Sequence, residues 1–195
     1  FKRWLVPSSK LSADRRMFRK LTGNPMNNTF LEIFFILVLI LINGFFSMSE
    51  IALVSARKVR LEQKAEEGDK GAKSALELTK STSKLLSAVQ VGITMVGILT
   101  VALGAATLAD RLTLVLEKIQ WLAPYASAVS ITIVVLLVTY FSLVLGELIP
   151  KRLALNEPEK IASSVSGFMR FLSKVMAPVV HLLSASTDLG LKILG

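Results

Sequence analysis

Two carboxylates, Glu50 and Glu147, stand within long apolar stretches of the sequence. An ionisable side chain inside a membrane helix is costly, so it normally faces a cavity or a partner and marks a functional pathway. Asn43 and Ser47 precede Glu50 at the helical spacing i, i+4 and i+7, which places all three on one face. Such a face would present two uncharged oxygen donors and one carboxylate to a ligand.

Two further apolar stretches carry polar groups at the spacing i, i+3 and i+7. These groups are Ser87, Gln90 and Thr94 in one stretch, and Thr139, Ser142 and Gly146, followed by Glu147, in the other. Pro150 cannot donate a backbone hydrogen bond to the carbonyl of Gly146, which is left to accept from an ion or water. Broken helices of this kind supply carbonyl oxygens to ions in transporters. We therefore predict a helix break near Pro150.

These groups are hard oxygen donors, which suits magnesium, sodium, calcium or manganese rather than zinc or copper. The chain has no Cys and a single His, so thiolate and polyhistidine metal sites are excluded. No Asp lies in the apolar stretches and His181 lies outside them, so we expect no enzyme. A single Ser or Thr can simply link two helices by hydrogen bonds. Three polar faces together with two carboxylates favour a cation site.

Three stretches without Lys or Arg must position these groups: residues 29–55, 85–109 and 128–148. Each is about long enough to cross roughly 30 Å of hydrocarbon as a helix. We therefore predict an all-α membrane protein with three transmembrane helices. Residues 56–84 and 152–195 are expected to form juxtamembrane amphipathic helices, with a fourth crossing by the apolar tail as the alternative. The net charge of +9 fits membrane flanks better than nucleic-acid binding, because no aromatic stacking run accompanies the cations.

With three crossings, the chain is expected to be a multi-pass protein of the inner (plasma) membrane. Its cation-rich segments should face the cytoplasm. The segment after the first helix and the tail are then inside, and residues 110–127 are outside. This orientation places all three polar faces in the inner half of the membrane, where they could meet. Residues 1–26 carry many cations on the outer side, so this N-terminal segment is either non-native or a surface helix.

Three motifs, NGFFSMSEIALVSAR, SKLLSAVQVGIT and GELIPKRLALNEP, resemble the transmembrane domain of the CNNM/CorC family, also called HlyC/CorC or hemolysin-like proteins. The resemblance covers residues 27–195. It implies a homodimeric domain of three transmembrane helices and a belt of juxtamembrane helices, associated with magnesium export coupled to sodium. It also implies a cytosolic pair of CBS domains that binds ATP, and these CBS domains are not part of this chain.

The resemblance assigns the ion-binding region to Ser47 and its neighbours, to polar positions near Gly92, and to Gly146 with Glu147. Many members have Gly-Asn-Asn where this sequence reads Gly92, Ile93, Thr94, so Thr94 or Gln90 would have to serve as ligand. Gly92, like Pro150, is a predicted position of helix interruption. Members with this pattern resemble a branch whose cargo is a different cation. The other alternative is a membrane anchor or regulatory scaffold for the CBS domains.

Small residues on the second apolar stretch suggest where two copies meet. Gly104 lies four residues after Thr100, and Ala102 and Ala106 have the same spacing. Small residues at this spacing let two membrane helices approach closely. We therefore predict a homodimer through the second and third helices, with Gly104 at the contact.

Overall fold

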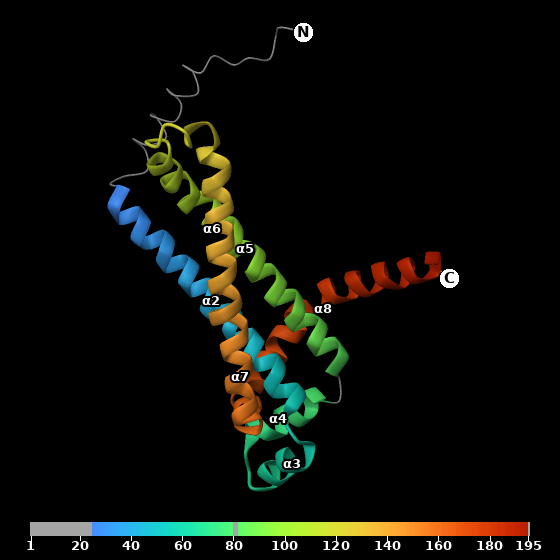
Figure 1. The fold of residues 1–195 in the computed structure, drawn as a ribbon. Coiled ribbons are helices and arrows are strands. Elements are labelled where there is room, and N and C mark those ends of the chain that lie inside the picture. Colours follow the sequence, from blue (N-terminus) through green and yellow to red (C-terminus); the bar gives the residue numbers. More distant parts are fainter. Residues whose placement is uncertain (1–24, 80–81, 195) are drawn as a thin grey trace.

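Long apolar helices form the body of the chain, and every element among the described residues is helical (Figure 1). The computed structural model describes residues 25–79 and 82–194. The three predicted stretches coincide with α2 (Pro25–Ser55), α5 (Thr82–Leu116) and α6 (Ala126–Leu143) together with its extension. Each of these helices is long and apolar enough to cross a membrane. The prediction of an all-α membrane fold is confirmed.

The third long helix continues past the position of the predicted break. α6 passes into a π-helical turn, η2 (Val144–Leu148), and then into α7 (Ile149–Asn156). The amide of Ile149 donates to the carbonyl of Val144, five residues earlier, which is the hydrogen-bond pattern of a π turn. Pro150 has no amide hydrogen, and the wider turn accommodates the lost bond without ending the helix. The predicted break is therefore a π turn within a continuous helix.

Two short helices, α3 (Lys58–Glu66) and α4 (Lys70–Thr79), follow α2. They correspond to the juxtamembrane helix predicted over residues 56–84, which is thus divided. Gly68 lies at the division with φ +94°, a conformation that residues with a side chain rarely adopt. Most of the N-terminal segment predicted over residues 1–26 lies outside the described residues, which begin at Pro25. Helix α2 starts at that same residue.

The tail forms one long helix, α8 (Pro158–Leu194), with Pro178 inside it. This helix confirms the helical content predicted for residues 152–195. By length and composition, its segment Pro158–Ile193 is a fourth candidate for crossing a membrane, although it is the least apolar of the four. Figure 1 shows that α8 starts beside α4 and that its C-terminal part points away from the bundle.

The two ends of the bundle differ in what they carry. α3, α4 and α7 lie at one end, and the α5–α6 connection with the short helix η1 (Ala123–Tyr125) lies at the other (Figure 1). This is the arrangement that the predicted orientation requires. At the connection end, Arg111 Nη2 donates to both carboxylate oxygens of Glu32, at 3.0 and 3.2 Å. This ion pair joins α2 to α5 at the connection end of the bundle.

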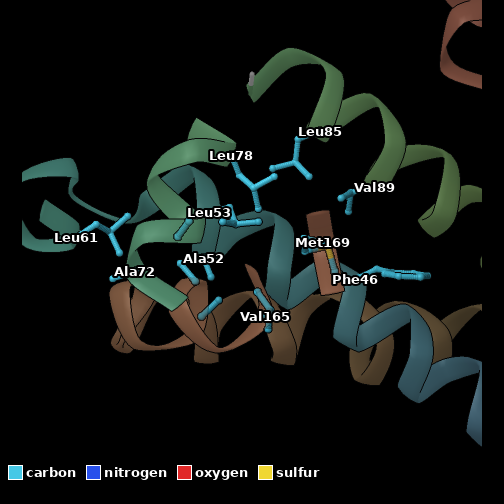
Figure 2. Close-up of a cluster of buried hydrophobic side chains, with 13 residues drawn as sticks. Phe46, Ala52, Leu53, Leu61, Ala72, Leu78, Leu85, Val89, Val165 and Met169 are labelled. Atoms are coloured by element: carbon cyan, nitrogen blue, oxygen red, sulfur yellow. The ribbon is translucent and has the colours of Figure 1, made fainter. Parts of the chain in front are cut away.

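A buried hydrophobic cluster holds the opposite end together (Figure 2). It combines side chains from α2, α3, α4, α5, α7 and α8, and five of the largest are Phe46, Leu61, Leu78, Leu85 and Met169. Moving one such side chain from water into the cluster stabilises the fold by about 1.5–3 kcal/mol. The cluster therefore fixes the short helices against the end of α2 and the start of α5.

Side-chain hydrogen bonds connect the start of α4 to α8 beside this cluster. Asp69 accepts hydrogen bonds from the amides of Gly71 and Ala72 at 2.7 and 3.1 Å, and so caps α4. Ser163 donates to the other oxygen of Asp69 at 2.7 Å, and Ser166 donates to the carbonyl of Gly71 at 3.0 Å. The hydrogen bond from Ser163, with those from the amides, lowers the pKa of the Asp69 carboxyl below its usual range. The start of α8 is thus fixed to the juxtamembrane helices.

The predicted role of Gly104 is wrong. A Cβ atom at this position would come within 2.8 Å of Val138 Cγ2 on α6 of the same chain. Gly104 therefore allows α5 and α6 to pack closely within one protomer, and it is buried there. Ala102 and Ala106 are exposed on the remaining surface of α5. The homodimer stays a prediction, without Gly104 at its contact.

Candidate functional site

The polar face predicted on α2 lies against the π turn η2. Asn43 Nδ2 donates to the carbonyl of Gly146 at 3.2 Å, and both residues are buried. Ser47, fully buried, lies 3.5 Å from the carbonyl of Glu147, at the outer limit of a hydrogen bond. The structure therefore brings together two of the three predicted faces through backbone carbonyls of the π turn.

Glycines make this close approach possible. A Cβ atom on Gly44 would lie 3.0 Å from Pro150 Cγ and 3.3 Å from the carbonyl oxygen of Leu145. A Cβ atom on Gly146 would lie 3.2 Å from both the carbonyl oxygen of Ile40 and the side chain of Asn43. Small residues at membrane helix contacts let polar groups and backbones meet in this way. Larger residues at either glycine would separate α2 from η2.

A lysine joins the two deep carboxylates. Lys151 Nζ donates to Glu147 Oε1 at 2.6 Å and lies 3.9 Å from Glu50 Oε2. The side chains of Glu147 and Lys151 remain about one third exposed, at 32% and 30%, and that of Glu50 is 17% exposed. The three groups carry a net charge of −1 when ionised. The ammonium of Lys151 thus offsets the charge of one of the two carboxylates.

Asn43 has an acceptor to spare. Its Oδ1 atom is buried and has no hydrogen-bond partner among the described residues. Buried polar atoms are nearly always satisfied, so an orphaned acceptor calls for a ligand, an ion or a water. Asn43 Oδ1 therefore belongs to the available oxygen donors of the site between α2 and η2.

The polar face of α5 lies elsewhere. Ser87, Gln90 and Thr94 line a groove of about 610 Å³ between α5 and α8, and no residue of α2 or η2 is among its lining residues. Each of these three side chains is exposed. The prediction that all three polar faces meet is therefore realised for two faces, and the third faces the tail helix.

Gly92 serves packing rather than a helix break. α5 runs as one helix from Thr82 to Leu116, so the predicted interruption at Gly92 is absent. A Cβ atom on Gly92 would lie 3.3 Å from Phe46 Cε2 on α2. One glycine inside a helix costs only about 1 kcal/mol relative to alanine, which close packing against a neighbouring ring offsets.

Lys151 was not among the predicted ligand residues, although the sequence offered it as a possible partner of Glu50, and the two side chains do lie 3.9 Å apart. Lys151 follows Glu147 at the spacing i+4, at which two side chains of one helix are neighbours. The sequence therefore already indicated an ion pair between these two residues. In the described residues, no group of three or more His, Cys, Asp or Glu side chains could hold a metal ion. A cation at this site would thus depend on backbone, amide and hydroxyl oxygens besides two carboxylates.

Comparison with known proteins identifies the family of the chain. Residues 34–195 match the family described as the Cyclin M transmembrane N-terminal domain, CNNM. The chain belongs to the CNNM family. The family resemblance of the three sequence motifs is thereby confirmed, and a CNNM membrane domain with several apolar helices is a multi-pass membrane protein.

Three relatives extend the comparison. UPF0053 protein sll0260 of Synechocystis is 54% identical over 165 residues, which are 85% of this chain and 37% of that protein. A polyamine export protein of Haemophilus influenzae is 36% identical over 148 residues, 74% of this chain and 33% of that protein. The inner membrane protein YfjD of Escherichia coli is 31% identical over 154 residues, 79% of this chain and 33% of that protein. The chain thus spans about a third of the length of these relatives. Its place in the inner membrane agrees with the name of the Escherichia coli protein.

Proposed function

We propose that this CNNM domain is the membrane part of a cation exporter and that the cation binds between α2 and η2. The orphaned Oδ1 atom of buried Asn43, next to the carbonyl of Gly146, is the observation that carries the proposal. A π turn inside a membrane helix is frequently a functional site, because it leaves backbone carbonyls free that would accept hydrogen bonds in a regular α-helix. Glu147 and Glu50 would supply the charge that neutral oxygens lack.

The first cargo to consider is magnesium, with sodium as the coupling ion. The atoms that could coordinate a metal ion there are oxygens, namely Asn43 Oδ1, the Ser47 hydroxyl and the carboxylates, which suits a hard cation. Magnesium prefers about six oxygens in a nearly octahedral arrangement and keeps several of its waters. The amide oxygen of Asn43, the hydroxyl of Ser47 and the carboxylate of Glu147 would supply part of that shell. Lys151 would have to move away to admit the ion.

The second cargo is a polyamine. The Haemophilus influenzae relative is named a polyamine export protein. An ammonium group, that of Lys151, already lies between Glu147 and Glu50 at 2.6 and 3.9 Å, so a primary amine of a substrate fits the same charge and size. The Gly92-Ile93-Thr94 sequence, which departs from Gly-Asn-Asn, also favours a cargo other than magnesium.

A transport measurement separates these functions. Purified full-length protein in proteoliposomes should move either radiolabelled spermidine or magnesium down an imposed gradient, and empty liposomes serve as the control. If the protein transports spermidine but not magnesium, the cargo is a polyamine. If it transports magnesium but not spermidine, the cargo is the metal ion. A regulatory scaffold without transport predicts no flux of either cation above empty liposomes, and that result would contradict the proposed function.

We also propose that three helices cross the membrane and that α8 lies along its inner surface. Because the chain has no Cys, single cysteines report unambiguously. Cysteines at Ser74 and Ile193 should label from the cytoplasmic side, and a cysteine at Glu117 from the outside. Labelling of Ile193 from the same side as Glu117 would show that α8 crosses the membrane as a fourth helix.

The remaining proposals concern the partners of the domain. We propose that the domain acts as a homodimer in the lipid bilayer and that a cytosolic CBS pair with bound ATP regulates export. The exposed apolar surface of α5, including Ile98 and Leu99, is available for a second copy or for lipid. Light scattering of the full-length protein in detergent would measure its oligomeric state.

A further inference from the structure

We propose that the groove between α5 and α8 binds a linear polyammonium ion, with the carboxylate of Asp188 as its anchor. This inference rests on the proposed export of a cation and adds a second site, where an organic cargo would first bind on the inner side. The groove lies apart from the α2–η2 site, and ten residues line it: Ser87, Gln90, Val91, Thr94 and Met95 of α5, and Val180, Leu183, Ser184, Thr187 and Asp188 of α8.

Asp188 provides the only charge in this lining. It forms no ion pair in the described part of the chain, although Lys192 lies one turn further along the same helix. A free carboxylate beside an apolar wall attracts a cation, and a charge-assisted hydrogen bond to an ammonium is about twice as strong as a neutral one. The charge of the groove therefore selects cations over anions and neutral molecules.

Two of the hydroxyl groups in the groove are arranged as acceptors. Thr94 donates its hydrogen to the carbonyl of Gln90 at 2.9 Å, and Thr187 donates to the carbonyl of Leu183 at 2.9 Å. Because both donors are used by their own helices, the hydroxyl oxygens keep only lone pairs for a ligand. The amide oxygen of Gln90 adds another acceptor. Acceptors of this kind match the N–H groups of an ammonium chain.

Apolar side chains separate these polar groups. Val91 and Met95 of α5 and Val180 and Leu183 of α8 form the rest of the wall. Methylene segments between ammonium groups would pack against them, whereas a hydrated metal ion would gain nothing from such a wall. The volume of about 610 Å³ is within the range of small-molecule sites, roughly 300–1,000 Å³. A polyamine thus fits the groove in charge, hydrogen bonding and shape.

The test measures binding of radiolabelled spermidine to the full-length protein in nanodiscs of neutral phosphatidylcholine, with empty nanodiscs subtracted. Asp188→Asn should weaken spermidine binding about tenfold or more, since it removes one charge-assisted hydrogen bond. Thr94→Trp should block the groove by filling it. The matched controls are Asp110→Asn, an exposed carboxylate at the far end of α5, and Ile33→Trp, an exposed position on α2 outside the lining.

Butylamine, which carries a single ammonium, should bind much more weakly than spermidine in the same assay. Spermidine binding by Asp188→Asn and Thr94→Trp at the level of the parent would overturn the groove site. If the groove variants bind normally while Glu147→Gln still abolishes export, the groove is wrong and the proposed function stands. If Glu147→Gln exports normally while Asp188→Asn loses spermidine, the α2–η2 site is wrong and the groove stands.

Discussion

Replacing Glu147 by Gln is expected to abolish cation export and to weaken cation binding by about a hundredfold or more. The substitution keeps the size of the side chain and removes a charge 2.6 Å from Lys151 Nζ. The carbonyls and hydroxyls that remain are neutral donors, which hold a dehydrated cation poorly. Flux into proteoliposomes and equilibrium binding to the purified full-length protein measure the two effects.

Two comparisons give this result its meaning. Glu117→Gln removes an exposed carboxylate beyond the end of α5 and should leave export unchanged. Ser47→Ala should weaken binding by a smaller margin, because the Ser47 hydroxyl is a neutral donor 3.5 Å from the carbonyl of Glu147. Export by Glu147→Gln at the level of the parent, with the protein folded and inserted, would mean that Glu147 is structural and that the α2–η2 site is misplaced.

The polar face of α2 was predictable because spacing alone determines it. Asn43, Ser47 and Glu50 share a helix face whatever surrounds them, and that face meets η2. The positions of the apolar helices were equally accessible, since the gaps between Lys and Arg mark the membrane directly. These features depend on one helix at a time.

Contacts between helices were less accessible. Spacing put Ser87, Gln90 and Thr94 on one face of α5 but could not tell which neighbour that face meets, because lipid and protein are both apolar. The prediction for Gly104 has the same limitation, because small residues favour a close helix contact but do not indicate which helix makes it. Sequence reasoning therefore assigned Gly104 to a second copy, whereas the structure assigns it to α6 of the same chain.

The form of the third helix also lay beyond the sequence. A proline in a helix removes one hydrogen bond, and the chain can respond by breaking, kinking or widening a turn. Here the turn widens, and the side chain of Asn43 takes the place of the lost amide at the carbonyl of Gly146. That replacement comes from α2, about 100 residues earlier in the chain, so the local sequence around Pro150 could not reveal it.

Replacing Lys151 by Met is expected to tighten cation binding about tenfold and to slow export. The ammonium of Lys151 neutralises one of two carboxylate charges in the empty site, so its loss changes the net charge there from −1 to −2. A cargo cation would then bind without displacing a competitor, and it would leave slowly because no internal ammonium replaces it. The concentration dependence of export should therefore show both a lower KM and a lower kcat.

Lys160→Met is the matched control, because Lys160 pairs with Glu157 on the exposed surface at the start of α8. This variant should keep the KM and the kcat of the parent. An unchanged KM in Lys151→Met would mean that the lysine does not compete with the cargo. In that case Lys151 only joins α7 to the carboxylate of Glu50, and cation exchange at the α2–η2 site proceeds without an internal counter-ion.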